Sequence, residues 1–196
     1  MKSARRSMKP EEVLASIEAA APSRGWPIIG PKRGMFLDEV VEEHKPARIL
    51  EVGTNVGYSA IRMARHLRKG QKLTCVEIRS DMAEIARSNF AKAGVSDRAE
   101  VVVGDALEVL PTLSGSFDMV FLDAVKDDYL KYLKSVERLL HKGSVVVADN
   151  VKLHGAHIKP YLDYVRSSGA YSSTYREAQP NWGIDEGDAV EISVRI

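Results

Sequence analysis

The chain has 196 residues, 44% of them hydrophobic and 28% charged, and its formal net charge is +1. This length suits one domain with a substantial core, and the composition is that of a globular protein rather than a disordered or fibrous one. The near-neutral charge gives no reason to expect nucleic acid as a partner, although a local basic patch is compatible with it. Arg5, Arg6 and Lys9 are interpreted as part of a solvated tail.

Neither a membrane span nor a secretory signal is expected, because no apolar run is long enough for the first and no suitable apolar segment follows Met1. The single cysteine, Cys75, lies in an apolar run and has no partner within the chain. We therefore expect it to be a small buried hydrophobe in a cytoplasmic protein.

Two helices are predicted before the first strand, at Glu11–Ala21 and Lys32–Glu43. The segment between them is expected to be an ordered loop, because it is rich in residues that break helices. These residues are Pro22, Gly25, Pro27, Gly30 and Pro31.

Short β-branched apolar runs then alternate with amphipathic stretches. The runs are almost continuously apolar, as is typical of parallel strands that are covered on both faces. Strands are expected at Arg48–Gly53, Lys72–Ile78, Ala99–Asp105, Phe117–Asp123 and Ser144–Asn150. Helices are expected at Tyr58–Leu67, Asp81–Ala93, Ala106–Leu113 and Asp127–His141, with stops near Lys69-Gly70, Gly94 and Lys142-Gly143.

The C-terminal part is predicted to form a helix at His157–Ser168 and two strands, Tyr171–Glu177 and Val190–Ile196, joined by residues 179–187. This last pair implies an antiparallel addition to a parallel sheet. The whole chain, residues 1–196, is thus expected to be one α/β domain with a doubly wound, seven-stranded, mostly parallel sheet and an antiparallel C-terminal strand.

The end of the first predicted strand carries a glycine turn, Glu51-Val-Gly53-Thr-Asn-Val-Gly57. Ligands of doubly wound sheets bind at the carboxyl ends of the strands, and glycine lets the backbone approach a ligand closely. A dinucleotide turn reads Gly-x-Gly-x-x-Gly, and here Glu51 takes the place of its first glycine. A carboxylate there suits a ligand with a cationic end, such as a sulfonium amino acid, better than a pyrophosphate.

Two further acidic residues end the next strands. Glu77 is placed to accept hydrogen bonds from a ribose diol, and Asp105 is placed to meet an adenine amino group. Each by itself also fits a solvated strand end or a helix N-cap. The three acidic ends together with the glycine turn favour an adenosine ligand.

The fourth and fifth strands end in Asp123 and in Asp149-Asn150. Two carboxylates and an amide oxygen at neighbouring strand ends are the ligands of a Mg²⁺ or Ca²⁺ type of site rather than a zinc site. Lys126 follows Asp123 closely, and a bound cation nearby would disfavour its ammonium form, so that it could act as a general base. A plain Asp123–Lys126 ion pair is the structural alternative.

With these residues in this order, the sequence resembles the metal-dependent O-methyltransferases of the catechol and caffeoyl-CoA type, and most closely the catechol group. The resemblance covers about residue 26 to the C-terminus and implies the Rossmann-like fold of class I methyltransferases. Its blocks are ILEVGTNVGYSAIRMARHL, CVEIRSDMAEIARSNFAKAGV, VVVGDALEVLP, FDMVFLDAVKDDYLKYL and LLHKGSVVVADNV.

The resemblance implies roles for particular residues. S-adenosylmethionine (SAM) would contact Ile29, Glu51, Gly53, Thr54, Tyr58, Ser59, Glu77, Ile78, Asp105, Ala106 and Asp123. Mg²⁺ would be held by Asp123, Asp149 and Asn150, and Lys126 would be the catalytic base beside Asp123. Lys126, Asn150 and Glu191 would contact the acceptor, and the helices within residues 1–45, with Trp26–Gly30 between them, would form part of a lid.

The sequence departs from the animal catechol enzymes in carrying Ala124-Val125 in place of His-Trp, Asp128 in place of a basic residue and Asn55 in place of an aromatic one. The expected reaction is methylation of a catechol-like small molecule by a monomer or homodimer. The alternatives left open are methylation of hydroxyuridine in tRNA and a SAM-binding protein without catalysis. A nicotinamide dehydrogenase is disfavoured by Glu51.

Overall fold

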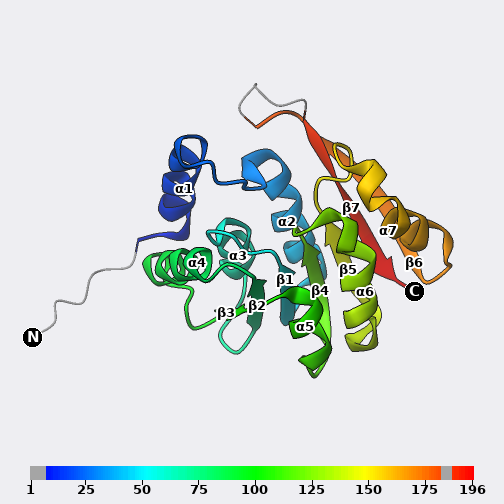
Figure 1. Cartoon of the computed structure of the whole chain (residues 1–196). Coiled ribbons are helices and arrows are strands. Elements are labelled where there is room, and N and C mark those ends of the chain that lie inside the picture. Colours follow the sequence, from blue (N-terminus) through cyan, green and yellow to red (C-terminus); the bar gives the residue numbers. More distant parts are fainter. Residues whose placement is uncertain (1–7, 182–186) are drawn as a thin grey trace, which may run out of the picture.

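The protein is a seven-stranded sheet with helices packed on both of its faces (Figure 1). The computed structural model describes residues 8–181 and 187–196. The strand order is β3-β2-β1-β4-β5-β7-β6, in which β7 runs antiparallel to both of its neighbours. The strands are β1 (Arg48–Val52), β2 (Lys72–Glu77), β3 (Ala99–Val103), β4 (Phe117–Leu122), β5 (Leu140–Ala148), β6 (Tyr171–Ala178) and β7 (Asp188–Arg195).

Successive side chains along each strand point to opposite faces of the sheet, and this divides the core into two layers. Ile49 of β1 packs in the layer that contains α1–α4, whereas its neighbour Leu50 packs in the layer that contains α5–α7. Both side chains are fully buried, which explains why the strands read as continuous apolar runs. The helices are α1 (Pro10–Arg24), α2 (Gly30–His44), α3 (Tyr58–Ala64), α4 (Ser80–Ala93), α5 (Ala106–Val109), α6 (Tyr129–Val136) and α7 (Gly155–Ser167).

The doubly wound fold, its seven strands and the antiparallel C-terminal strand are confirmed. Several predicted helix ends are wrong. The loop before α2 is only residues 26–29, because Pro22 lies in the last turn of α1 while Gly30 and Pro31 open α2. A proline is tolerated in the first turn of a helix, where its missing N–H has no intrahelical partner.

The helix predicted at Asp127–His141 is also shorter and less regular than expected. Residues 126–128 and 137–139 are 3-10 turns on either side of α6, and β5 already begins at Leu140. The pair Lys142-Gly143 therefore belongs to a strand rather than to a helix end. Among the residues described, no helix is both long and apolar enough to cross a membrane. Arg5, Arg6 and part of the predicted 179–187 connection lie outside the described residues.

Candidate active site

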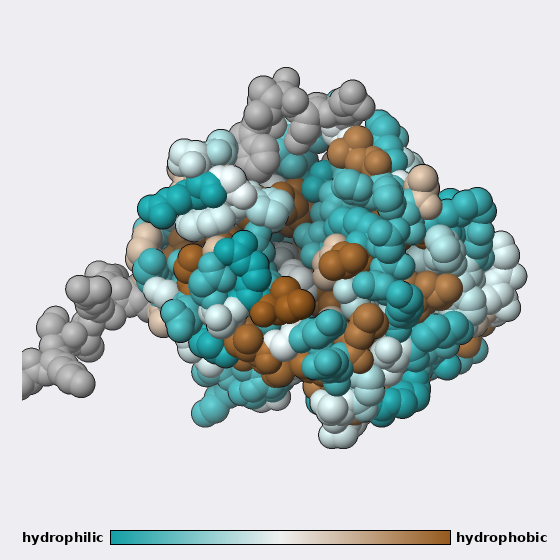
Figure 2. All heavy atoms as spheres, viewed as in Figure 1, coloured by the Kyte–Doolittle hydropathy of each residue, from teal (hydrophilic) through white to brown (hydrophobic). Residues whose placement is uncertain are grey.

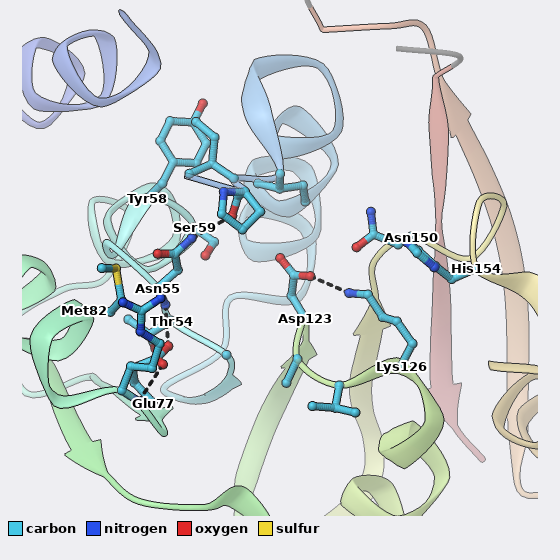
Figure 3. A pocket seen from close by; sticks show the side chains of 17 residues that line it. Thr54, Asn55, Tyr58, Ser59, Glu77, Met82, Asp123, Lys126, Asn150 and His154 are labelled. Carbon is cyan, nitrogen blue, oxygen red and sulfur yellow. Dashed lines mark hydrogen bonds and ion pairs between the residues drawn. The ribbon is translucent and has the colours of Figure 1, made fainter. Parts of the chain in front are cut away.

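A cavity of about 600 Å³ opens at the carboxyl ends of β1, β2, β4 and β5. Figure 2 shows the hollowed face of the molecule, and Figure 3 shows the side chains that line the cavity. The turn after β1 and the 26–29 loop form one end, and the ends of β4 and β5 form the other. The predicted site residues that line it are Ile29, Gly53, Thr54, Tyr58, Ser59, Glu77, Asp123, Lys126 and Asn150.

The turn after β1 needs glycine at its first position. Gly53 has a φ of +92°, and a Cβ built on it would lie 2.2 Å from the backbone oxygen of Asp123. The two strand ends are therefore in direct backbone contact, which only a residue without a side chain permits. This contact places the β1 turn beside the acidic end of β4.

Glu51 lies behind the turn rather than in the cavity. Its carboxylate is fully buried and accepts hydrogen bonds from the hydroxyls of Thr54, at 2.8 Å, and Ser59. Burial raises the pKa of Glu51 to about 7, although the two hydroxyls act in the opposite direction. Thr54 and Ser59 themselves line the cavity, so Glu51 orients the polar groups that a ligand would meet.

Glu77 organises the same turn from the end of β2. Its carboxylate accepts hydrogen bonds from the backbone N–H groups of Asn55, at 2.7 Å, and Arg79, at 3.0 Å (Figure 3). The Asn55 backbone has a φ of +49°, and its side chain donates to the carbonyl of Pro27 in the loop before α2. The predicted ribose-binding carboxylate thus holds the turn as well as facing the cavity.

A smaller hollow of about 120 Å³ adjoins the cavity and shares Gly53, Glu77 and Val125 with it. Ile78 and Val125, which both line this hollow, are 66% and 58% exposed, which is unusual for apolar side chains of this size. The predicted residues Asp105 and Ala106 also line it. Asp105 also caps α5 by accepting the N–H of Leu107 at 2.8 Å, so the N-cap interpretation is correct.

The loop before α2 covers part of the cavity through Pro27, Ile28 and Ile29. Asn181 holds the end of this loop where it meets α2, since the Asn181 side chain accepts the N–H of Lys32 and donates to the carbonyl of Ile29. These two hydrogen bonds join the start of α2 to the segment that follows β6.

Tyr58 lines the cavity, and its hydroxyl contacts one residue of α1 and one residue of its own helix, α3. The hydroxyl donates to Glu18 of α1 and accepts from Arg62 of α3, so it is directed away from the ligand space. Burial raises the pKa of Tyr58 well above its usual value. Tyr58 therefore serves the cavity as an apolar wall.

The opposite end of the cavity carries the Asp123–Lys126 pair. The Lys126 Nζ lies 2.8 Å from Oδ1 of Asp123 and 2.8 Å from the hydroxyl oxygen of Tyr129 (Figure 3 shows the first of these contacts). The ion pair that was the structural alternative is thus present. It lies inside the cavity, with both side chains about one-fifth exposed.

Asp149 is almost completely buried beside this pair, and α2 supplies its counter-ion. The Arg33 Nε lies 2.8 Å from Oδ1 of Asp149, and Arg33 also donates to Oδ2 at 3.2 Å. Burial and the nearby charge of Asp123 raise the pKa of Asp149, while Arg33 lowers it. Arg33 is itself 8% exposed, so the guanidinium and the carboxyl group meet inside the protein.

Asn150 is held in a strained backbone conformation, with a φ of +61°. Its Nδ2 donates to the buried carboxylate of Asp188 at 2.7 Å, which leaves Oδ1 as the atom available to the cavity. Figure 3 shows this oxygen turned toward Asp123. Asp188 also accepts the N–H groups of Lys152 and Leu153 and so fixes the turn after β5.

The donor set can be compared with the needs of a divalent cation. The described residues contain no group of three His, Cys, Asp or Glu side chains suited to a metal. Asp149 does not line the cavity, but its carboxyl group is close enough to Asp123 to feel that charge. Figure 3 shows the amide oxygen of Asn150 turned toward Asp123. Two carboxylates and one amide oxygen, with positions left for water and a ligand, fit Mg²⁺ chemistry. Asp123, Asp149 and Asn150 are thus suited to a hard cation, although Lys126 already contacts Asp123 and Arg33 already contacts Asp149.

Glu191 is not brought to the cavity. It lies on β7 opposite Ala148 of β5 and is 1% exposed, and Arg166 of α7 binds both of its carboxylate oxygens at 2.7–2.8 Å. Successive residues of a strand face opposite sides of the sheet, and Glu191 faces α7 whereas Val190 faces the other layer. The predicted contact between Glu191 and the acceptor is therefore not supported by the structure.

Several residues of the site were missed by the sequence interpretation. Arg33 and Tyr129 both contact Asp149, and Arg79 and Met82 line the cavity. The cavity is also lined by His154, which lies near the acidic strand ends in the sequence and was interpreted as a loop histidine. His154 follows the Asn150 turn, where its N–H donates to the Asn150 carbonyl at 3.1 Å. A charged residue on the apolar side of the α2 pattern was the available signal for Arg33, but only the fold brings it to Asp149.

The architecture and the site together define the class of protein. A doubly wound sheet with an antiparallel strand, a glycine turn and acidic strand ends is the architecture of class I methyltransferases. The O-methyltransferase TomG from Streptomyces achromogenes, solved in complex with SAM, superposes with a TM-score of 0.84 at 30% identity, over 94% of this chain and 89% of that one. An O-methyltransferase from Bacillus cereus in complex with SAH superposes at 0.83 and 29% identity, over 100% and 94%.

Sequence comparison identifies the family. The O-methyltransferase family model matches residues 5–193. The chain is 39% identical to catechol O-methyltransferase B of Danio rerio, over 94% of this chain and 72% of that protein. It is 36% identical to the catechol O-methyltransferase of Mus musculus, over 85% of this chain and 65% of that protein, and so spans less than two thirds of its length. The chain belongs to the O-methyltransferase family and is a SAM-dependent O-methyltransferase.

Proposed function

We propose that the protein transfers the methyl group of SAM to one hydroxyl of a small aromatic vicinal diol, with Mg²⁺ or another divalent cation bound. The observation that carries the proposal is the juxtaposition of Asp123, Lys126 and Asn150 at one end of the cavity that the glycine turn and Glu77 line at the other. The relatives named catechol O-methyltransferase support this acceptor class.

The cofactor would lie between the two ends of the cavity. Its ribose diol would meet Glu77, and its adenine would enter the smaller hollow between Ile78 and Val125, near Asp105 and Ala106. Its amino-acid end would meet Thr54 and Ser59, which Glu51 orients. Ile29 and the 26–29 loop would form part of the lid over it.

Asp123, Asp149 and Asn150 would hold the cation. When bound, the cation would supply positive charge beside the acceptor hydroxyls. A phenol titrates near about pH 10, so at neutral pH it needs help to lose its proton. Lys126 would take that proton, and the acceptor oxygen would then form a bond to the methyl carbon while the carbon–sulfur bond breaks and its electron pair stays on sulfur.

The test is a methyl-transfer assay on catechol with and without Mg²⁺, after treatment with EDTA. We expect turnover that depends on the metal, and a fall of at least about 100-fold in kcat for Lys126→Ala, because a positioned general base contributes about 10²–10⁴-fold. Asp123→Asn should lose most of its Mg²⁺ affinity in calorimetry. Full activity after removal of the metal, or methyl transfer that is unchanged in Lys126→Ala, would contradict the proposal.

A further inference from the structure

The environment of Lys126 contains a second anchor besides Asp123. Residues 126–128 form a 3-10 turn that leads directly into α6, whose first residue is Tyr129. Side chains three residues apart eclipse each other in a 3-10 turn, so Lys126 and Tyr129 lie on the same side. As a result the Tyr129 hydroxyl oxygen lies 2.8 Å from the Lys126 Nζ.

The direction of the hydrogen bonds in this cluster is fixed by chemistry. The Tyr129 hydroxyl donates to the backbone carbonyl of Asp149, at 3.3 Å, which can only accept. The lone pairs of the hydroxyl are therefore left to accept from Lys126, whose amine donates. Tyr129 is completely buried, and its ring packs edge-to-face on Tyr161 with centroids 5.9 Å apart, so the hydroxyl has a defined position.

Two fixed acceptors determine how the Lys126 amine is oriented. A neutral amine has two N–H bonds and one lone pair in a tetrahedral arrangement. Asp123 and Tyr129 accept one N–H each, at 2.8 Å. The lone pair is then left in the remaining direction, and Lys126 lines the cavity.

We propose that Tyr129 is a positioning residue for the catalytic base, which holds the Lys126 amine so that its lone pair faces the acceptor oxygen. This inference rests on the proposed function of Lys126. It extends that function by tying the base, through one hydroxyl, to the backbone of Asp149 at the end of β5.

The test compares Tyr129→Phe with Tyr161→Phe, which removes a hydroxyl of the same kind from the neighbouring buried ring. Each variant is assayed with catechol and with 4-nitrocatechol, whose nitro group makes the reacting hydroxyl much more acidic. We expect Tyr129→Phe to lower kcat for catechol about tenfold, because general-base efficiency depends on alignment. KM should stay within twofold, and kcat for 4-nitrocatechol should fall much less because that hydroxyl needs little help from a base. Tyr161→Phe should leave both values of kcat within twofold.

Equal losses of kcat on both acceptors, or no loss on either, would overturn the inference. If wild type methylates neither acceptor, the proposed function fails separately, and the position of Lys126 is still tested by crystal structures of wild type and Tyr129→Phe. The Nζ should keep Asp123 but leave its wild-type position in the variant, and an unmoved amine would refute the role of Tyr129. If Tyr129→Phe does not fold, replacement of Tyr129 by 3-fluorotyrosine keeps the packing, and the same dependence of kcat on acceptor acidity is expected with a smaller amplitude.

Discussion

Single buried carboxylates determine much of the chemistry of this site. Glu51, Asp149 and Asp188 are each no more than 1% exposed, yet each has a different set of partners. Glu51 accepts hydrogen bonds from two hydroxyls, Asp149 contacts a guanidinium, and Asp188 accepts hydrogen bonds from backbone N–H groups. Burial raises the pKa values of Glu51 and Asp149, while the hydroxyls that contact Glu51 and the guanidinium that contacts Asp149 act in the opposite direction.

Glu51→Gln should change how stability depends on pH. The folded-state pKa of Glu51, about 7, lies above its ordinary value of 4.5, so between these values the unfolded chain releases a proton that the folded chain keeps. Stability should therefore fall as pH rises from 4.5 to 7, by up to about 3 kcal/mol at about 1.4 kcal/mol per pKa unit. Gln cannot ionise and should remove this slope.

The measurement is thermal unfolding of wild type and Glu51→Gln from pH 5 to pH 8. The variant should gain stability relative to wild type toward pH 8, and it should bind SAM more weakly because Gln cannot accept from both Thr54 and Ser59 with the same geometry. Parallel curves for the two proteins across this range would show that Glu51 is ionised throughout.

The turn after β1 is the element on which the cofactor end of the cavity depends. The position of the glycine turn, Glu77 and the acidic strand ends followed from the sequence, because alternation of strands and helices fixes which residues lie at the carboxyl edge of a parallel sheet. The bounds of α6 and the start of β5 did not follow. Residues 137–143 combine a 3-10 turn with an irregular strand start, which periodicity does not distinguish from a helix end.

Gly53→Ala should disrupt this element far more than a matched change elsewhere. Gly70 has the same φ of +92°, but a Cβ there would meet nothing within 4 Å. Gly70→Ala should therefore cost about 1–2 kcal/mol from the left-handed backbone alone. Gly53→Ala adds a clash with the Asp123 carbonyl. The free energy of unfolding measured in urea should therefore fall clearly further in this variant, and SAM binding should be lost. Equal falls in the free energy of unfolding for the two variants would show that the backbones of β1 and β4 can move apart at little cost.

On the scale of the whole molecule, a ligand that spans both ends of the cavity should stabilise the folded state. At a SAM concentration about 100 times Kd, the expected gain is about 2.7 kcal/mol, which corresponds to a rise in Tm of about 5–10 °C for a chain of this size. NADH should give no comparable rise, because Glu51 replaces the first glycine of the dinucleotide turn. A thermal-shift titration measures both, and an equal response to NADH would contradict the assignment of the turn.

The sequence by itself determined the class of fold and the edge of the sheet that carries the site. These depend on local patterns, namely apolar runs, glycine positions and acidic residues at strand ends. Only the tertiary structure decided which charges meet there. Arg33 reaches Asp149 across 116 positions of the chain, and Arg166 binds Glu191 away from the cavity because β7 presents alternate residues to opposite layers. Contacts of this kind depend on how helices and strands pack in three dimensions, which spacing along the chain does not specify.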